Sequence, residues 1–363
     1  MYKEEIAKKI EAVEKEIHDT PYDKSSQFHH GVLKAKLSKL RDSLEEKISG
    51  GAGGGVGYAI KHSGDASVVL VGLPSVGKST LLNAVTNAES KVGNYDFTTL
   101  GVIPGMMEYK GIKIQMLDLP GIIEGAASGK GFGRKVLSVI RASDLVVLMA
   151  DIQRMAWLGV IKKEMENAGV RLNTKPPKMH IHRTDKGSLR IVDPYSTLDR
   201  EQMKEIAREM GLDNAVIQIT EKIETFDRFI DGLSKSRTYI PLVEVVTKID
   251  MATDEQIVNV PVEAIKMSAD LGVGIDEFKE RVWKKLELMR IYLKRERNGE
   301  PDKQDPLIMK KGQTLKDVLQ KISKQMSEDI TRAFIWGKEA KFQGQEVSFK
   351  YQVFDEMEVW FGR

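Results

Sequence analysis

Residues 66–80 read ASVVLVGLPSVGKST. The apolar run at 68–71 predicts a buried β-strand, and Gly72 to Ser79 then match the phosphate-loop pattern GxxxxGK[ST]. A polyphosphate carries several charges, and glycines let the backbone curl so that successive N–H groups point at it. A helix that begins near Lys78 adds its positive end. The stretch therefore predicts a nucleotide-binding α/β fold built on a strand, a phosphate loop and a helix.

The residue types inside this loop predict individual roles. Lys78 can reach the β- and γ-phosphates and stabilise developing charge, and the Ser79 hydroxyl can bind Mg²⁺. A chance glycine turn is the alternative, but the strand in front of the pattern and the helix after it argue against one. The loop residues expected to contact nucleotide are Pro74, Ser75, Val76, Gly77, Lys78, Ser79 and Thr80.

Two further motifs point to the same site. Residues 113–117 predict a strand, and the sequence DLPG follows it. In this motif Asp118 can hold Mg²⁺ through water, and the Gly121 N–H can contact a γ-phosphate. Thr98 and Thr99 lie between the two motifs and are candidates for a switch residue that closes over Mg²⁺ and γ-phosphate. Thr99 is the first choice as a direct Mg²⁺ ligand, and Thr98 is the fallback.

The base-recognition segments come much later in the chain. Residues 245–250 read VVTKID, and residues 266–269 read KMSA. A carboxylate such as Asp250 can accept two hydrogen bonds from guanine N1 and the exocyclic amine, which adenine cannot offer. The residues expected to read, cover and close over guanine are Thr247, Lys248, Asp250, Ser268 and Ala269. Each motif alone is weak, but all of them in this order predict a GTP site.

Composition sets broad limits on the chain. With 363 residues, of which 41% are hydrophobic, two or three domains with real cores are expected. The absence of cysteine excludes disulfides and thiolate metal sites and favours a reducing cytoplasm. No apolar run approaches the roughly 18 residues of a membrane helix, and the N-terminus is charged, so neither a span nor a signal peptide is expected. A net charge of +3 is weak evidence for nucleic acid.

Changes in periodicity and composition divide the chain into parts. Apolar residues at helical spacing in 2–18 and 26–47 predict an antiparallel helical hairpin, which is either a folded appendage or a docking arm. The glycine-rich run GGAGGGVG at 50–57 predicts a flexible linker. The expected parts are a helical hairpin at 1–49, a linker at 50–64, a nucleotide domain at 65–174 and 241–292, an inserted α+β subdomain at 175–240 and a C-terminal domain at 293–363.

Three expectations concern the parts outside the nucleotide site. In the insertion, residues 179–183 and 188–192 predict a β-hairpin around the turn TDKG, and such an insertion is usually a partner surface or a lid. Residues 276–297 predict one basic amphipathic helix, a type that can contact a membrane or RNA. The preferred interpretation is that its apolar face closes the nucleotide domain and that its basic face meets solvent, phosphate or RNA. One helix at 315–326 among short strands predicts a β-grasp module at the C-terminal end.

The chain resembles the developmentally regulated GTP-binding proteins (DRG), a branch of the Obg family of GTPases, and an archaeal-type member in particular. The resemblance covers nearly the whole chain. It implies a Ras-like GTPase domain, an insertion similar to the second domain of ribosomal protein S5, and a C-terminal TGS domain. It rests on GLPSVGKS at 72–79, FTTL at 97–100, DLPGIIEG at 118–125, RLN at 171–173 leading into prolines 176 and 177, TYIP at 238–241 and LKAKL at 33–37.

Two positions depart from the usual pattern of such enzymes. Thr247 stands where the guanine motif normally has an Asn that braces both the phosphate loop and the base, so some loss of bracing is expected. Ile122 stands where Ras-type enzymes place the Gln that orients the attacking water. Intrinsic hydrolysis is therefore expected to be slow and to be raised by a partner, a ribosome or a monovalent cation. K⁺ is the candidate cation, although related K⁺-binding enzymes often use an Asn where this chain has Ser75.

Together these observations predict a Mg²⁺-dependent GTPase switch in which water attacks the γ-phosphate in line and GDP and phosphate leave. The family resemblance implies a role in translation, with a ribosome or RNA and a DRG-family regulatory protein as partners and no membrane. The residues expected to act in catalysis are Lys78, Thr99 and Gly121, and those expected to bind Mg²⁺ are Ser79, Thr99 and Asp118. Two alternatives stay open. One is a nucleotide-bound adaptor, or RNA- or ribosome-binding module, with negligible turnover, and the other is an ATPase.

Overall fold

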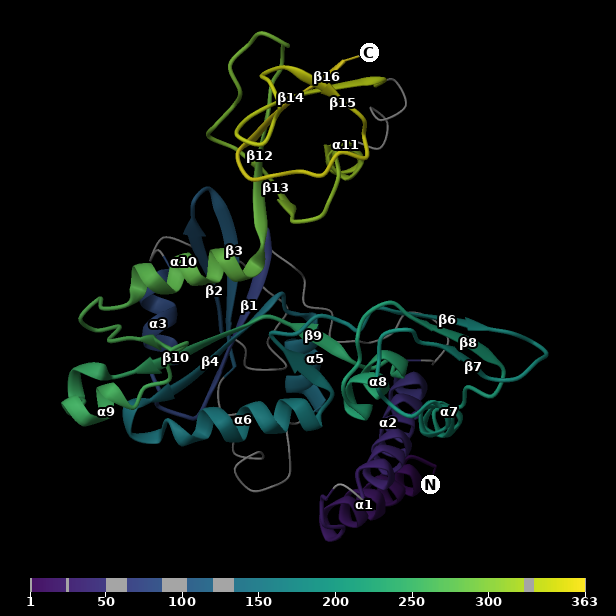
Figure 1. The fold of residues 1–363 in the computed structure, drawn as a ribbon. Helices are drawn as coiled ribbons and strands as arrows, with labels where there is room; N and C mark the ends of the chain where they lie inside the picture. The colour runs from purple at the N-terminus through teal and green to yellow at the C-terminus, as the bar shows by residue number, and fades with distance from the viewer. Residues whose placement is uncertain are drawn as a thin grey trace. The chain divides into compact units, whose positions relative to one another are not determined.

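The computed structural model describes residues 2–23, 26–49, 64–86, 103–119, 134–322 and 330–362. The chain forms two compact units (Figure 1). Unit 1 contains residues 1–59 and 169–239, and unit 2 contains residues 60–168 and 240–363. None of the helices in the described ranges combines the length and the hydrophobicity that crossing a bilayer requires.

A six-stranded sheet forms the core of unit 2, and its strands follow the order β11-β10-β4-β1-β3-β2. All neighbouring strands run parallel except β2, which pairs antiparallel with β3. The strands are β1 (Ala66–Gly72), β2 (Ile103–Tyr109), β3 (Ile112–Asp118), β4 (Leu145–Asp151), β10 (Leu242–Thr247) and β11 (Ile265–Lys266). β1 and β4 are buried along their whole length, as their nearly continuous apolar sequence predicts for parallel strands. This topology confirms the predicted Ras-like α/β domain.

The register of this sheet positions the predicted site. Leu70 lies beside Asp118, and Thr247 lies beside Asp151, so the carboxyl ends of β1, β3, β4 and β10 meet at one edge. In open α/β sheets, ligands bind beyond this edge. Helices α3 and α10 pack against each other, and α6 packs on β4. The helices are α3 (Lys78–Val85), α5 (Arg134–Ala142), α6 (Ala156–Asn167), α9 (Asp254–Val258) and α10 (Ile275–Leu286).

Gly72 ends strand β1 where the backbone passes close to β4. A Cβ atom at this position would lie 2.4 Å from the Met149 carbonyl oxygen, which is closer than real Cβ contacts. Gly72→Ala is therefore expected to lower the free energy of unfolding of unit 2 by about 1–3 kcal/mol in urea titrations, because the core becomes overpacked. Gly159→Ala is the matched control, since no atom lies within 4 Å of its Cβ position. Equal losses in both variants would contradict the prediction.

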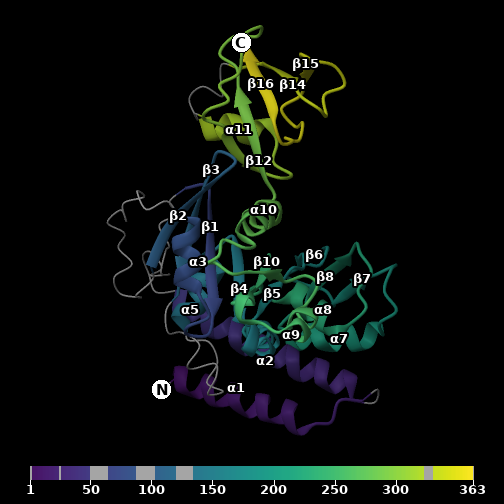
Figure 2. The ribbon, with the colours of Figure 1, turned by 90° about the vertical axis from the view of Figure 1, so that its left-hand side faces the viewer.

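A five-stranded sheet in unit 2 has the order β13-β12-β16-β14-β15. Its strands are β12 (Leu288–Leu293), β13 (Leu307–Lys310), β14 (Arg332–Trp336), β15 (Gln345–Val347) and β16 (Met357–Gly362). β12 and β16 pair in parallel, and the other neighbours are antiparallel. Helix α11 (Leu315–Ile322) covers one face of the sheet through Leu315 and Val318 (Figure 2). One helix on a mixed sheet agrees with the predicted β-grasp module.

The predicted helix at 276–297 is wrong in its second half. α10 ends just before Glu287, which takes a left-handed φ of 50°, and strand β12 begins at the next residue. The sequence of this half also fits the alternation of a strand, because Met289, Ile291 and Leu293 all face the core of the C-terminal sheet. Pairing with β13 and β16 decides between the two patterns in favour of the strand.

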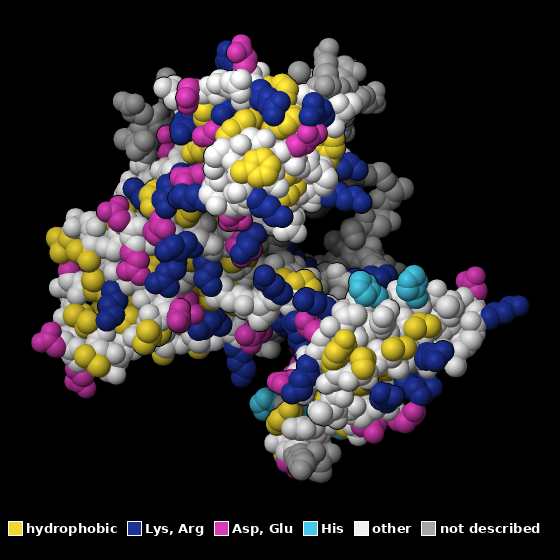
Figure 3. Space-filling model, turned by 45° about the horizontal axis from the view of Figure 1, so that its top comes forward, with side chains coloured by type: hydrophobic (Ala, Val, Ile, Leu, Met, Phe, Trp, Pro, Cys, Tyr) yellow, Lys and Arg dark blue, Asp and Glu magenta, His cyan; other side chains and the backbone are white. Residues whose placement is uncertain are grey.

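The chain has nearly equal numbers of basic and acidic residues, 56 and 53. On the face drawn in Figure 3, Asp and Glu side chains lie among those of Lys and Arg. A mixed surface of this kind produces no extended field of one sign that would steer a polyanion to that face.

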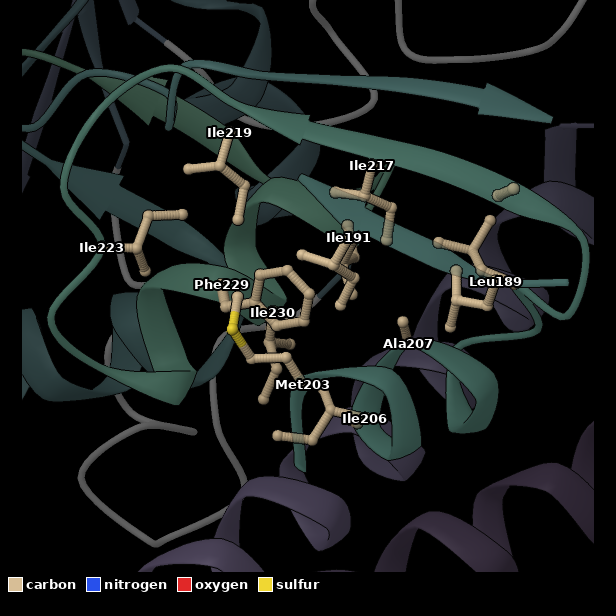
Figure 4. Packing of buried hydrophobic residues seen from close by; sticks show 14 residues of the cluster. Leu189, Ile191, Met203, Ile206, Ala207, Ile217, Ile219, Ile223, Phe229 and Ile230 are labelled. Carbon is tan, nitrogen blue, oxygen red and sulfur yellow. The ribbon is translucent and has the colours of Figure 1, made fainter. Parts of the chain in front are cut away.

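The insertion in unit 1 is a three-stranded sheet of order β6-β8-β7, formed by β6 (Met179–Arg183), β7 (Arg190–Val192) and β8 (Ala215–Ile219). The predicted hairpin of β6 and β7 is wrong, because β8 lies between them and runs parallel to β7. Burial explains the order. Ala215, Ile217 and Ile219 are almost completely buried, so β8 takes the central position, and α7 (Arg200–Glu209) and α8 (Phe226–Leu233) contribute to the same core (Figure 4).

The N-terminal helices α1 (Tyr2–Asp19) and α2 (Gln27–Ser49) confirm the predicted pair and reveal what it packs on. α2 packs against α7 and α8, and Ala35 is fully buried within the core of the insertion. The Phe28 and Phe226 rings meet edge to face, with centroids 6.2 Å apart. Helix α2 and the insertion therefore share one core. A two-stranded ribbon of β5 (Val170–Leu172) and β9 (Thr238–Ile240) adjoins the insertion in sequence.

Candidate nucleotide-binding site

A cavity of about 480 Å³ lies at the carboxyl edge of the six-stranded sheet. Its walls come from the phosphate loop, the end of β3 and the segment that follows β10. The lining residues are Pro74, Ser75, Gly77, Lys78, Ser79, Thr80, Asp118 and Lys248. All of them are residues that the sequence predicts to contact nucleotide, so the fold brings three separate motifs to one cavity.

Two left-handed residues shape the phosphate loop. Ser75 has a φ of 61°, and Gly77 has a φ of 88°. Gly77 is also the N-cap of α3, and it provides no side-chain hydrogen bond to the first helical turn. The first N–H groups of α3 therefore have no side-chain cap, and together with the positive end of the helix dipole they can bind an anion.

Lys78 lies in the cavity wall and is only 7% exposed. Its Nζ donates to the carbonyl oxygens of Gly72 and Leu73 at 3.1 and 3.0 Å. Burial lowers the pKa of this ammonium group, and the charge of Asp118 opposes that shift. A polyphosphate in the cavity would add negative charge close to Nζ and would favour the charged form of Lys78.

Ser79 and Asp118 present oxygen atoms that suit Mg²⁺. The Ser79 hydroxyl donates to Asp118 Oδ2 at 2.6 Å. Asp118 is 1% exposed, and its Oδ1 has no hydrogen-bond partner in the part of the chain that the structure describes. Leaving a buried carboxylate oxygen unpaired costs free energy, which a cation bound directly or through water would recover. The two side chains therefore fit a Mg²⁺ ion.

Thr247 connects the base-recognition segment to the phosphate loop. It is 3% exposed, and its hydroxyl donates to the Val76 carbonyl oxygen at 2.7 Å. The Ala150 carbonyl oxygen lies 3.3 Å from the same hydroxyl. A threonine at this position thus retains a brace on the loop, although the sequence predicts some loss of bracing when Asn is replaced.

Thr247→Val keeps the shape of the side chain and removes this brace. We expect the variant to bind GDP about fivefold more weakly, because one neutral hydrogen bond contributes about 1 kcal/mol. Titration with a fluorescent GDP analogue measures the change. Thr220→Val is the control, since the Thr220 hydroxyl makes a similar bond to the Lys178 carbonyl at 3.0 Å in unit 1. Unchanged GDP affinity in Thr247→Val would show that the brace does not serve binding.

Backbone hydrogen bonds hold the two base-recognition segments together. The Ile249 N–H donates to the Met267 carbonyl at 3.3 Å, and the Met267 N–H donates to the Val246 carbonyl at 2.8 Å. Because β10 and β11 are neighbours in the sheet, the segments VVTKID and KMSA leave it side by side. Their joint role in binding guanine stays a prediction.

The side chains of these segments differ in exposure. Lys248 lines the cavity with a left-handed φ of 58°, and Asp250 is exposed. Ser268 is buried, and Ala269 is half-buried. An exposed carboxylate on Asp250 is open to a ligand, and its role in reading guanine stays a prediction.

The predicted switch residues Thr98 and Thr99 and the predicted γ-phosphate contact Gly121 lie outside the described residues. Their roles therefore stay predictions from the sequence.

Sequence reasoning missed two side chains beside the phosphate loop. Asp151 ends β4, and Arg154 follows in a short 3₁₀ turn (Ile152–Arg154). The Arg154 guanidinium donates to the Pro74 carbonyl at 3.2 Å and to Asp151 Oδ2 at 2.6 Å. The position of Asp151 could have been noticed, because a carboxylate at the end of a buried parallel strand lies at the ligand-binding edge. No local pattern marks Arg154.

Comparisons with known proteins identify the family of the chain. A family model described as a 50S ribosome-binding GTPase matches residues 67–183, and the model of the C-terminal region of the same domain matches residues 186–288. An uncharacterised GTP-binding protein of Methanocaldococcus jannaschii is 44% identical over 96% of this chain and 91% of its own length. Developmentally-regulated G-protein 3 of Arabidopsis thaliana is 40% identical over 97% of both chains.

Ribosome-interacting GTPase 1 of Saccharomyces cerevisiae is 38% identical over 96% of both chains. Identities of this size over almost the full length of both partners extend far beyond the nucleotide motifs, so they include the insertion and the C-terminal sheet. Because these relatives are named as GTP-binding proteins or GTPases, they do not support the alternative of an ATPase. The chain therefore belongs to the developmentally regulated GTP-binding proteins, and it is a P-loop GTPase.

Proposed function

We propose that this chain is a Mg²⁺-dependent GTPase switch that acts on the large ribosomal subunit during translation. The observation that carries the Mg²⁺-dependent chemistry is the cavity in which Lys78, Ser79 and the unpaired, buried oxygen of Asp118 lie together. The ribosomal part is supported by the family description, a 50S ribosome-binding GTPase, and by the name of the yeast relative. It does not rest on a basic surface, since the charges on the face in Figure 3 are mixed.

In the proposed reaction, the γ-phosphate of GTP is attacked in line by water. Lys78 and the loop N–H groups would stabilise the charge that develops on the phosphoryl oxygens. Ser79, Asp118 and Thr99 would hold Mg²⁺, which when bound neutralises charge between the β- and γ-phosphates. The Gly121 N–H would contact the γ-phosphate. Guanine would be read and covered by Thr247, Lys248, Asp250, Ser268 and Ala269.

The remaining predictions complete the proposal. The chain would act in the cytoplasm, and a DRG-family regulatory protein would bind and stabilise it. The C-terminal sheet would be the TGS domain and, with the insertion and the hairpin, would contact the ribosome or RNA. K⁺ is a candidate activator.

The test is single-turnover GTP hydrolysis with and without 50S subunits, in K⁺ and in Na⁺, after affinities for GDP, GTP and ATP have been measured. Tight binding of guanine nucleotides and hydrolysis that 50S subunits accelerate would support the switch. Tight binding with negligible hydrolysis under every condition would favour the adaptor. Acceleration by K⁺ alone would refute the ribosomal part of the proposal.

Asp250→Asn tests how guanine is read. The amide presents a donor where the carboxylate accepts from guanine, so GTP affinity is expected to fall at least about tenfold and xanthosine triphosphate affinity to rise. Competition binding with both nucleotides measures the exchange. Asp254→Asn, a neighbouring exposed carboxylate at the start of α9, is the control and should change neither affinity. An unaltered preference in Asp250→Asn would refute the guanine assignment.

A further inference from the structure

Arg154 touches the phosphate loop from outside the nucleotide cavity. Its Nη2 donates to the Pro74 carbonyl oxygen at 3.2 Å, although Arg154 itself does not line the cavity. Arg154 belongs to the short turn that directly follows β4, and β4 is the neighbour of β1 in the sheet. The turn that follows β4 therefore supports the phosphate loop, which follows the neighbouring strand β1.

Asp151 anchors this guanidinium. Its Oδ2 accepts from Arg154 Nε at 3.0 Å and Nη2 at 2.6 Å, and Lys248 Nζ lies 3.9 Å away. Asp151 is 5% exposed. Burial alone would raise the pKa of Asp151, but the hydrogen bonds and charges of Arg154 and Lys248 outweigh burial and hold the pKa below its ordinary value. The carboxylate is thus charged at neutral pH and fixes the arginine in one place.

The geometry of the peptide group explains what this contact does. All described peptide bonds are trans, so a carbonyl oxygen and the next N–H point in opposite directions. Arg154 bonds the Pro74 carbonyl oxygen from outside the cavity lining, so the Ser75 N–H of the same peptide group is fixed on the side opposite to Arg154. Thr247 fixes the next-but-one peptide group in the same way, through its hydrogen bond to the Val76 carbonyl oxygen.

We infer that Arg154, held by Asp151, is a positioning residue that keeps the Ser75 N–H aimed at the phosphates. The inference rests on the proposed function, since it assigns a role within the same nucleotide site. The contact spans the loop where Ser75 adopts a left-handed φ of 61°, a conformation that a residue with a side chain adopts rarely and that needs support from its surroundings. The anchored arginine provides that support.

Arg154→Ala separates positioning of the loop from general stability. We expect the affinity for GDP to fall about tenfold and the affinity for GMP to stay unchanged, because GMP lacks the β-phosphate that the loop holds. The preference for GDP over GMP should therefore shrink about tenfold. Arg154→Lys keeps the charge but not the fork that bonds Asp151 and Pro74 together, so it should restore the preference only in part.

Lys162→Ala is the matched control. Lys162 on α6 donates to both carboxylate oxygens of Glu244 on β10, at 3.0 and 3.1 Å. Its side chain is 36% exposed, close to the 37% of Arg154. None of its described hydrogen bonds reaches the phosphate loop. Its loss should leave the ratio of the two affinities unchanged. Asp151→Asn, which weakens the anchor and keeps its size, should reduce the ratio even if Arg154→Ala fails to fold.

A normal GDP-to-GMP ratio in folded Arg154→Ala and Asp151→Asn, with a wild-type chain that binds GDP tightly, would overturn the inference alone. An equal loss in Lys162→Ala would also overturn it, because the effect would then be a general loss of stability. A wild-type chain that bound neither GDP nor GTP would overturn the proposed function and the inference with it.

Discussion

Lys78→Met is expected to slow GTP hydrolysis by at least about a hundredfold, which is the usual loss when one donor to developing charge is removed. Lys78 is the buried cation in the wall of the cavity, and its ammonium already donates to two loop carbonyls. Methionine has a similar length but provides neither charge nor donor. Single-turnover assays with saturating GTP and Mg²⁺ measure the rate without the contribution of product release.

The control for this variant is Lys163→Met, which replaces an exposed lysine on α6. It should hydrolyse GTP at the wild-type rate. Circular dichroism of both variants checks that the fold is intact. If Lys78→Met retained more than about a tenth of the wild-type rate while binding GTP, the ammonium would not serve the transition state and the proposed mechanism would need another cation.

The second large effect is expected in unit 1. Asp231→Ala should lower the free energy of unfolding of this unit by about 3–5 kcal/mol, the usual result of breaking a buried ion pair on one side. Asp231 and Arg237 are each only 8% exposed. Arg171 donates to both carboxylate oxygens at 2.6 and 2.7 Å, and Arg237 donates at 2.7 Å. Without the carboxylate, the guanidinium groups of Arg171 and Arg237 lose the counter-charge that they share.

Hydrogen exchange of the α8 and β8 amides reports on this unit separately from unit 2. Asp227→Ala is the control, because Asp227 lies on the same helix and pairs with Lys34 at 2.7 Å but is 54% exposed. An exposed pair contributes at most about 1 kcal/mol, so the protection of these amides should change little. If the two variants lost protection equally, burial of the ion pairs of Asp231 with Arg171 and Arg237 would not explain their contribution to the stability of unit 1.

The nucleotide site could be predicted from the sequence to the extent that it is local. A phosphate loop, a DxxG motif and a TKID segment are each contiguous, and buried strands in front of them place them at one edge of a sheet. The sequence did not predict Asp151 and Arg154 as part of the site, because their partners Pro74 and Lys248 come near only after β4 has paired with β1 and β10. Contacts made by strand pairing leave no trace in local spacing.

The errors in the fold have a similar cause. Residues 288–293 carry an apolar pattern that fits both a helix and a strand, and the choice depends on pairing with β16, more than 60 residues later. In the insertion, the turn TDKG suggested that adjacent strands pair, but the more buried β8 took the centre of the sheet. In both cases the structure depends on strand pairing between residues far apart in the sequence.

The shared core of α2 and the insertion also bears on how the chain is made. Synthesis proceeds from the N-terminus, so α2 leaves the exit tunnel long before α7 and α8 exist. Phe28, Val32 and Ala35 face the core of the insertion in the finished protein, and this surface has to remain uncovered while the intervening segment of the GTPase domain is being synthesised. The nascent chain therefore carries an exposed apolar face of α2 through much of its elongation, and this face is a surface that a chaperone can cover before release.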